Sequence, residues 1–294
     1  MLSLVLPKGS LERATMELFA AADLAVSRSS AADYRASIAD RRIESVRILR
    51  PQEIPEYIAR GLFDLGITGR DCIEESGAQV VSLGELSYSK ATNQPARVVL
   101  AVAQDSPVRS LGDLASMGRP VKVSSEYPEL TKRRLAEHGV DAEVFFSYGA
   151  TEAKVPDIAD CVVDMTETGA GLGAAGLRIV DTLLISPTEL IANAESADDP
   201  KKRRAMEQIY TLLCGTLEAR EKVLVKLNVA ADGLPAVVER LPSLRAPTVS
   251  QLAGSDAYAV ETVVLKAEIN TLIPELKELG ASDILELALS KIVH

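Results

Sequence analysis

The stretch VVDMTETGAGLGAAGLRIV, residues 162–180, sets one carboxylate, Asp164, behind an apolar run and then gives most positions to glycine, alanine and threonine. The apolar run predicts a strand, and the small residues predict a turn that opens a helix. Such a turn exposes several backbone N–H groups, which an anion such as a phosphate can approach closely. Alternatively, small residues only let the helix pack tightly on the sheet, because glycine-rich turns are common.

Composition limits the classes of protein that the chain can belong to. It has 294 residues and a net charge of −10, so we expect two or three compact units and neither a nucleic-acid nor an acidic-membrane partner. No apolar run reaches the roughly 18–20 residues that span a bilayer, and the first residues lack a basic leader before a long apolar stretch. We therefore expect a cytoplasmic protein without a membrane partner.

The scarcity of cysteine and histidine limits the chemistry. The three cysteines lie far apart, at positions 72, 161 and 214, which favours neither disulfides nor a Cys-based zinc site. There are two histidines, and His138 precedes a glycine that is typical of a helix end, so a Ser-His-Asp triad is not expected. The chemistry must use carboxylates, Lys, Arg, backbone amides and Mg²⁺.

The chain alternates strands with helices, which predicts parallel sheets covered on both faces. Strands are expected at 2–7, 44–51, 64–69 and 78–83, and a second α/β lobe is expected to begin near residue 96. Three strand-end loops carry polar groups: Lys8-Gly9-Ser10, Arg50, and Thr68-Gly69-Arg70-Asp71. Each loop alone is an ordinary turn, but together with the 162–180 turn they suit a ligand with phosphates at both ends.

Residues 223–289 read as strand, helix, strand, strand, helix, strand, the order of a small ferredoxin-like module. We expect either a dimerisation module or a receptor for an amino-acid ligand near Thr248 and Ser250, whose hydroxyls suit a zwitterion. The basic run at 201–204 is interpreted as a solvated helix face, with an anion site as the alternative.

Three segments carry a family resemblance: LPKGSL (6–11), DLGITGRD (64–71) and GATEAKVPDIADCVVDMTETGAGL (149–172). With the spacing between them, they resemble ATP phosphoribosyltransferase, the first enzyme of histidine biosynthesis. The resemblance covers essentially the whole chain, and the C-terminal module makes it similar to the long form.

The resemblance implies a fold and a domain division. It implies two lobes like those of periplasmic binding proteins plus a C-terminal ACT/PII-like regulatory domain. The expected first lobe is 1–93 and 180–215, the second is 94–179, and the regulatory domain is 216–294.

The resemblance also implies a reaction. N1 of ATP displaces pyrophosphate from phosphoribosyl pyrophosphate with Mg²⁺, in a homo-oligomer between dimer and hexamer that histidine inhibits by feedback. Sequence does not indicate which groups hold the metal.

The resemblance also implies which residues form the site, because positions of this chain match positions of the family motifs. Asp164 is expected to bind the ribose hydroxyls and the following loop the 5′-phosphate; Lys8, Arg50 and Asp164 are the expected catalytic residues. The phosphoribosyl pyrophosphate residues are Asp164, Thr166, Glu167, Thr168, Gly169, Ala170, Gly171 and Leu172. The nucleotide residues are Lys8, Gly9, Arg50, Asp71 and Glu152, and the histidine residues are Thr248 and Ser250.

The chain departs from the family pattern at the phosphate loop. The family commonly has Thr or Ser where Gly171 stands, often Arg at Gly173 and Asn at Ala175, and the stretch 152–164 is one residue shorter than usual. The 5′-phosphate would lose a hydroxyl contact and depend more on backbone amides.

Two other function classes fit parts of the pattern. A non-catalytic solute-binding protein also has two α/β lobes around a cleft. A nucleobase-salvage phosphoribosyltransferase also has an acid before a Thr-Gly turn, but usually two adjacent acids, whereas here Val163 precedes Asp164.

Overall fold

The computed structural model describes residues 1–30, 32–88, 95–242 and 246–294. The chain forms two compact units, Met1–Tyr210 and Thr211–His294. The first unit contains a seven-stranded and a five-stranded sheet, and the second a four-stranded sheet. In the described ranges, no helix has the length and apolar character needed to cross a membrane.

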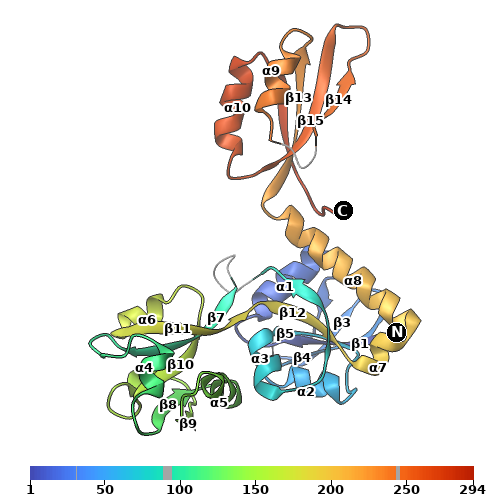
Figure 1. The fold of residues 1–294 in the computed structure, drawn as a ribbon. Helices are drawn as coiled ribbons and strands as arrows, with labels where there is room; N and C mark the ends of the chain where they lie inside the picture. Colours follow the sequence, from blue (N-terminus) through green and yellow to red (C-terminus); the bar gives the residue numbers. More distant parts are fainter. Residues whose placement is uncertain (31, 89–94, 243–245) are drawn as a thin grey trace. The chain divides into compact units, whose positions relative to one another are not determined.

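The seven-stranded sheet has the order β2-β3-β4-β1-β5-β12-β6. Its strands are β1 (Leu2–Pro7), β2 (Val26–Ser27), β3 (Arg35–Ile38), β4 (Ile43–Leu49), β5 (Leu65–Gly69), β6 (Val81–Leu86) and β12 (Thr188–Ala192). Helices α1 (Glu12–Ala21), α2 (Ile54–Ala59) and α3 (Arg70–Ser76) connect the first strands (Figure 1). The strands β4, β1 and β5 are parallel, as expected, but β3 and β12 run antiparallel to their neighbours. The prediction of a purely parallel sheet was therefore wrong here.

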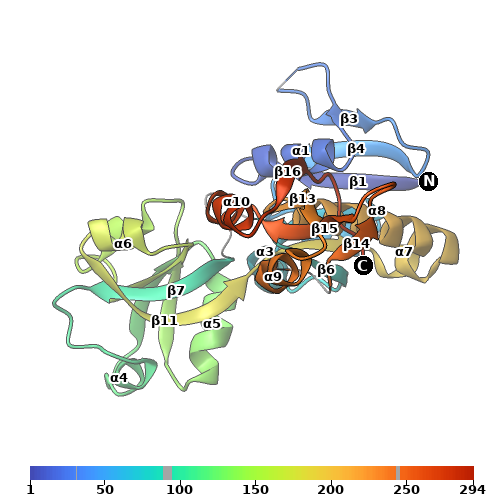
Figure 2. The same ribbon diagram turned by 90° about the horizontal axis from the view of Figure 1, so that it is seen from above.

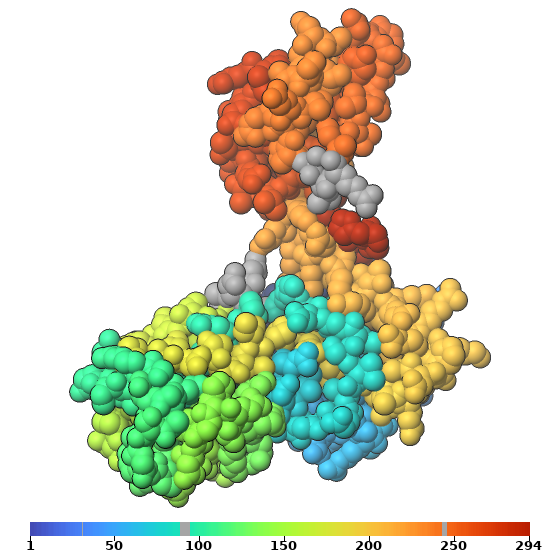
Figure 3. Space-filling view, in the orientation of Figure 1, coloured from blue at the N-terminus to red at the C-terminus, as the bar shows by residue number. Residues whose placement is uncertain are grey.

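The five-stranded sheet has the order β11-β7-β10-β8-β9. Its strands are β7 (Ala96–Ala103), β8 (Val121–Ser125), β9 (Ala142–Phe146), β10 (Cys161–Thr166) and β11 (Leu177–Ser186). The strands β10, β8 and β9 are parallel, whereas β7 runs antiparallel to β10 and β11, so this sheet is also mixed. In the space-filling view the green residues, which include β8 and β9, gather in one lobe of the first unit, and the blue residues of the N-terminal part lie in another (Figure 3).

Helices cover both faces of the five-stranded sheet. Alternate β7 residues point to opposite faces: Val98 and Leu100 pack with α4 (Leu111–Ala115) and α5 (Pro128–Glu137), and Val99 packs with α6 (Ala170–Ala174). Figure 2 shows α5 and α6 on opposite sides of this sheet. Because residues 161–163 are fully buried between the two layers, the loop that follows them has a fixed origin.

The observed lobe boundary differs from the expected one. Residues 180–186, which we had assigned to the first lobe, complete β11 and stay in the five-stranded sheet. The chain returns to the seven-stranded sheet at Pro187, because β12 begins at Thr188.

The basic run at 201–204 lies in α8 (Pro200–Ala219), which follows α7 (Ala194–Asp198). Lys202 Nζ lies 2.6 Å from Asp64 Oδ1. Burial alone would raise the pKa of Asp64, but hydrogen bonds from Lys202, Ser196 and Ser3 outweigh burial and lower that pKa to about 2. Lys202 therefore attaches α8 to the seven-stranded sheet.

The second unit is the expected module. Its elements are β13 (Lys222–Ala230), α9 (Leu234–Arg240), β14 (Thr248–Gln251), β15 (Ala257–Leu265), α10 (Ile269–Glu278) and β16 (Ser282–Ala288). The order β14-β15-β13-β16, with every neighbouring pair antiparallel, is the ferredoxin-like arrangement. Buried residues of β13, β15, α9 and α10 form its core.

Candidate active site

A cleft of about 690 Å³ lies in the first unit, a volume typical of small-molecule sites. Both sheets contribute to it: Asp71 and Cys72 come from α3, and Glu126, Tyr127 and Asp164 come from the five-stranded lobe. The other lining residues are Ser10, Leu11, Pro51, Gln52, Gly69, Glu85, Leu86, Ser87, Tyr88, Pro95, Ala96, Met165, Thr166, Glu167, Thr168, Ser186, Pro187 and Thr188.

The first lobe places two predicted cations together at one sheet edge. The strands β1 and β4 are parallel with Pro7 opposite Leu49, so Lys8 and Arg50 follow them side by side. The Lys8 amide donates to the Leu49 carbonyl at 2.7 Å, and a side chain at Gly9 would lie 3.7 Å from Arg50 Nη1. Lys8, Gly9 and Arg50 do not line the cleft themselves, but the next residues in the chain do.

Tyr34 is a neighbour of this pair that the sequence analysis missed. Lys8 Nζ lies 3.8 Å from the centre of the Tyr34 ring, a cation–π distance. The nearby Lys8 ammonium is the main reason that the pKa of the Tyr34 phenol is lowered. A ligand phosphate that pairs with Lys8 would therefore compete with Tyr34.

Asp71 is buried and held in one orientation. The Asp71 amide donates to Ser186 Oγ at 2.9 Å, and the Ser186 hydroxyl donates back to Asp71 Oδ1 at 2.6 Å. Cys72 Sγ lies 3.3 Å from Asp71 Oδ2. A Cβ at Gly69 would lie 2.1 Å from Asp71 Oδ1, so only glycine fits before this carboxylate. Burial also raises the pKa of the Cys72 thiol well above its ordinary value, which makes it a poor nucleophile.

The second lobe places two acids at the ends of paired strands. The strands β8 and β10 are parallel with Ser125 opposite Val163, so Glu126 and Asp164 follow at the same edge. Burial raises the pKa of Asp164, and the nearby Glu152 raises it further. Burial and Asp164 raise the pKa of Glu126. Sequence analysis missed Glu126, although an acid directly after a buried strand was the signal that identified Asp164.

The loop after Asp164 has the predicted conformation. Gly169 has a φ of +81° and precedes α6, a backbone conformation that favours glycine. Thr166 Oγ1 accepts from the Gly169 amide at 2.8 Å, and Thr168 Oγ1 accepts from the Ala170 amide at 3.3 Å. Because a hydroxyl can donate while it accepts, both threonines keep a proton for an incoming phosphate oxygen. The Leu172 side chain is buried, which leaves only its backbone for a ligand.

Comparison with known proteins decides the family. Residues 50–215 match the family model described as ATP phosphoribosyltransferase, and residues 219–291 match the model described as HisG, C-terminal domain. The chain belongs to the ATP phosphoribosyltransferase family. The predicted family and fold class are thereby confirmed, and family membership decides against both alternative function classes.

Relatives match nearly the whole chain. The ATP phosphoribosyltransferase of Chlorobium phaeovibrioides is 44% identical over 292 residues, which cover 99% of this chain and 97% of that protein. The ATP phosphoribosyltransferase of Pelotomaculum thermopropionicum is 43% identical over 292 residues and 99% of both chains. A structure of the ATP phosphoribosyl transferase (HisG:HisZ) complex from Thermotoga maritima matches with a TM-score of 0.62 at 23% identity, covering 74% of this chain and 99% of that chain. At this identity, the structural match shows a shared fold.

In the described part of the chain, no group of three or more His, Cys, Asp or Glu side chains could hold a metal ion. The cleft nevertheless offers the two neighbouring carboxylates Glu126 and Asp164. Mg²⁺ in phosphate-transferring sites usually takes one or two carboxylates and completes its shell with substrate oxygens and water. The residues therefore fit an ion that is held largely by substrate.

The predicted histidine residues of this family member lie in the second unit. Thr248 and Ser250 are exposed on β14, an edge strand. They project from the face opposite the core, because the register pairs them with Glu261 and Ala259, whereas Val249 faces the buried Val260. A shallow depression beside them is lined by residues 251–256 and includes neither hydroxyl.

The acids of the cleft are expected to cost stability at neutral pH. The pKa of Asp164 is higher in the folded protein than in the unfolded chain, where it is about 4. Ionisation of Asp164 therefore begins to lower the free energy of unfolding as the pH rises above about 4. The loss is complete once the pH exceeds the raised pKa of the folded protein. Asp164→Asn removes the buried charge, so the Tm at pH 7 should rise by about 2–4 °C, the shift that about 1 kcal/mol produces in a domain of this size.

The matched control is Asp160→Asn, just before the same strand. Hydrogen bonding to Arg119 lowers the pKa of Asp160 despite its partial burial, so this substitution should lower the Tm at pH 7. Thermal melts at pH 7 and pH 3 measure both effects, and a lower Tm for Asp164→Asn at pH 7 would contradict the assignment of a half-buried carboxylate whose charged form is disfavoured by burial.

Proposed function

We propose that this chain transfers phosphoribosyl from phosphoribosyl pyrophosphate to N1 of ATP, giving N1-(5-phosphoribosyl)-ATP and pyrophosphate, the first step of histidine biosynthesis. The observation that carries the proposal is a single cleft in which Asp164 and the Thr166–Thr168 loop of one lobe lie with Asp71 of the other. Family membership gives the reaction, and the cleft gives places for both substrates. Because both substrates are cytoplasmic metabolites, we also expect a cytoplasmic enzyme.

The second lobe binds the sugar donor. Asp164 and Glu126 accept hydrogen bonds from the ribose hydroxyls, since both lie at the same strand ends. In this arrangement Glu126 supplies the second acid that salvage phosphoribosyltransferases carry next to the first. The Thr166 and Thr168 hydroxyls and the amides of Gly171 and Leu172 bind the 5′-phosphate, while the Gly169 and Ala170 amides hold the two threonines.

The first lobe binds the groups that react with the sugar. Lys8 and Arg50 pair with pyrophosphate, and Gly9 lets the ligand approach between them. Asp71 contacts the nucleotide together with Glu152, which lies near Asp164 on the second lobe, and the Ser186 hydrogen bonds keep Asp71 in position. These assignments place the cations Lys8 and Arg50 at the pyrophosphate and the carboxylates Asp164 and Glu126 at the uncharged ribose hydroxyls, so none of these four groups repels the part of the substrate that it binds.

Catalysis requires positioning more than a strong side-chain nucleophile. A bond forms between adenine N1 and C1 of the ribose, the bond from C1 to the pyrophosphate oxygen breaks, and pyrophosphate leaves with the electron pair. Asp164 and Glu126 stabilise positive charge that develops on the sugar, while Lys8 and Arg50 stabilise the departing pyrophosphate. Mg²⁺ supplies Lewis-acid stabilisation of phosphate oxygens when it is bound. Holding both substrates in line can contribute roughly 7–11 kcal/mol in favourable cases.

We further propose that the second unit binds histidine through Thr248 and Ser250 and inhibits the enzyme, and that the enzyme works as a homo-oligomer between dimer and hexamer. The support is the match to the family's C-terminal domain model and the exposed hydroxyls on β14. Inhibition requires histidine to bind two states of the enzyme with different affinities, typically by 1–3 kcal/mol.

Mixing the protein with ATP, phosphoribosyl pyrophosphate and Mg²⁺ tests the reaction, with the adduct followed by its absorbance. The expected result is an adduct that needs all three components, together with one pyrophosphate released per adduct. Adduct formation with a free nucleobase in place of ATP, and none with ATP, would contradict the proposal.

The departure at Gly171 gives a gain-of-function prediction. A Cβ at this position meets no atom within 4 Å, so Gly171→Thr should fit and restore the hydroxyl that the family commonly has. We expect the KM for phosphoribosyl pyrophosphate to fall about 3- to 10-fold, because a hydrogen bond to a charged group contributes about 1 kcal/mol or more.

Gly171→Val is the matched control, since it adds nearly the same shape without the hydroxyl. Steady-state kinetics at saturating ATP separate the two variants. Equal KM values for the Thr and Val variants would show that a hydroxyl at position 171 does not reach the 5′-phosphate.

A further inference from the structure

Helix α5 begins without a cap from its own neighbours. Its N-cap residue, Tyr127, makes no side-chain cap hydrogen bond, and Pro128 at the first helical position has no N–H. The amides of Glu129 and Leu130 have no partner within the helix, because the first N–H groups of a helix never do. These two donors need an acceptor from elsewhere in the molecule.

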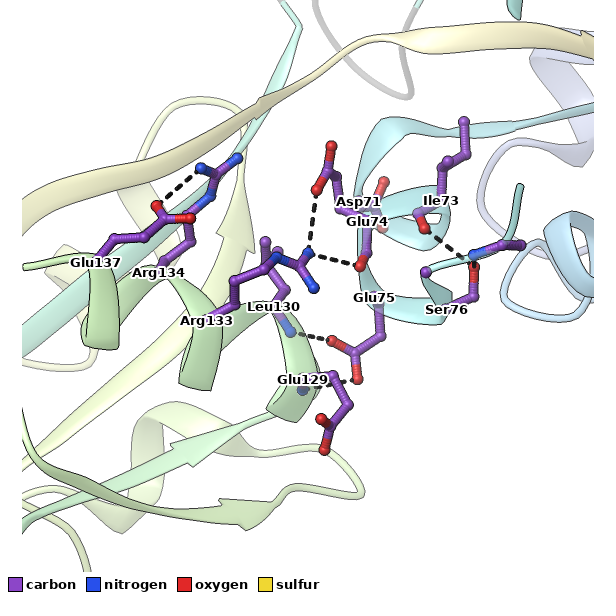
Figure 4. A network of polar contacts seen from close by, with 12 residues as sticks. Asp71, Ile73, Glu74, Glu75, Ser76, Glu129, Leu130, Arg133, Arg134 and Glu137 are labelled. Atoms are coloured by element: carbon purple, nitrogen blue, oxygen red, sulfur yellow. Dashed lines mark hydrogen bonds and ion pairs between the residues drawn. The ribbon is translucent and has the colours of Figure 1, made fainter. Parts of the chain in front are cut away.

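The acceptor comes from the other lobe. Glu75, on α3, accepts from the Glu129 amide at 3.1 Å with Oε1 and from the Leu130 amide at 2.8 Å with Oε2 (Figure 4). A carboxylate suits a helix N-terminus, because the helix dipole is positive there. Arg133 Nη2 adds bonds to the Glu74 carbonyl at 2.7 Å and to Glu74 Oε2 at 3.0 Å.

The same two helices carry cleft residues. Asp71, Glu74 and Glu75 are spaced i, i+3 and i+4 and therefore lie on one face of α3. On the other side, α5 starts directly after Glu126 and Tyr127, which line the cleft. Consequently, the Glu75 contact fixes the separation between Asp71 of one lobe and Glu126 of the other.

We propose that Glu75 is a positioning residue that holds the two lobes of the first unit in the arrangement in which both substrates are bound. In the described ranges, the strand order places two passages from one sheet to the other, one after β6 and one at Pro187 between β11 and β12. Two crossings permit a hinge motion, and the Glu75 bonds to α5 oppose opening. The substrate effects below rest on the proposed function, whereas the bonds themselves do not.

Loss of the contact should have a distinct kinetic signature. If only a fraction of the free enzyme is closed, every ligand that bridges the lobes binds more weakly by that same fraction. Glu75→Ala should therefore raise the KM for ATP and for phosphoribosyl pyrophosphate by a common factor of about 5. The kcat should stay within about 2-fold, because bound substrates close the lobes themselves.

The experiment measures kinetics, Tm and amide exchange in the full-length protein. Glu75→Gln keeps one acceptor oxygen and should recover part of the KM change. The matched control is Glu56→Ala, which removes an exposed glutamate that pairs with Arg60 on α2 and should change neither KM. Hydrogen exchange should become at least about 10-fold faster at the Glu129 and Leu130 amides in Glu75→Ala, and the Tm should change by less than about 2 °C.

Two results would overturn the proposal. Unchanged exchange at both amides would show that Glu75 does not cap α5, and this readout decides the matter even if the substrates differ from those proposed. Faster exchange with both KM values unchanged, or a fall in kcat alone, would show that the cap exists but does not set the lobe arrangement.

Discussion

Replacing Asp164 by alanine is expected to lower kcat/KM for phosphoribosyl transfer by about 10²- to 10³-fold, the usual effect of removing one preorganised group that stabilises transition-state charge. The carboxylate is half-buried at the end of β10 and lines the cleft. Its pKa is raised by burial, so its removal should not lower the Tm. Initial rates and a thermal melt on the same preparation measure both quantities.

The neighbouring acid provides the comparison. Glu126→Gln keeps the shape and one acceptor oxygen, so it should act in the same direction with a smaller loss. Asp160→Asn, outside the cleft, should change the Tm and leave kcat/KM within about 2-fold. Unchanged transfer by Asp164→Ala would refute the role of this residue.

Removal of residues 216–294 is expected to abolish histidine inhibition, the second of the large effects. The second unit has its own core, and the described residues that form the cleft all belong to the first unit. Transfer by residues 1–215 should therefore remain measurable, while the histidine concentration for half-inhibition should rise by at least about 10-fold, within the usual range of allosteric coupling.

Point variants keep this prediction testable if the shortened chain does not fold. Thr248→Ala with Ser250→Ala should weaken inhibition without affecting uninhibited transfer. Ser282→Ala is the control, because it removes an exposed hydroxyl on β16, the other edge strand of the same sheet. Full inhibition of the shortened chain would rule out a regulatory role for the second unit, and full inhibition of the Thr248/Ser250 variant would place the ligand elsewhere.

Periodicity predicted much of the fold, and the strand-end loops gave the candidate site residues. The predicted strands 2–7, 44–51 and 64–69 correspond to β1, β4 and β5. Strand direction was less predictable. Periodicity shows which residues face the core, but it does not show in which direction the chain enters the sheet for the next strand. The antiparallel placements of β7 and β12 depend on crossings between lobes, and β2 and β3 lie in a stretch whose large apolar residues are only Val26, Tyr34 and Ile38.

Contacts between segments that lie far apart in the chain could not be predicted, because no local sequence pattern indicates them. Ser186 holds Asp71 across 115 positions, and Glu75 caps a helix of the other lobe across more than 50. Glu126 could have been identified from the sequence, because it directly follows the stretch VKVSS (121–125) as Asp164 follows its own apolar run. What sequence did not show is that β8 and β10 are neighbours, and this pairing brings the two acids together.

A crystal structure of the protein with phosphoribosyl pyrophosphate and Mg²⁺ tests the central claim most directly. We expect the 5′-phosphate at the loop of residues 166–172, within hydrogen-bond distance of the Thr166 and Thr168 hydroxyls, and the ribose hydroxyls at Asp164 and Glu126. A donor bound elsewhere, with this loop empty, would contradict it.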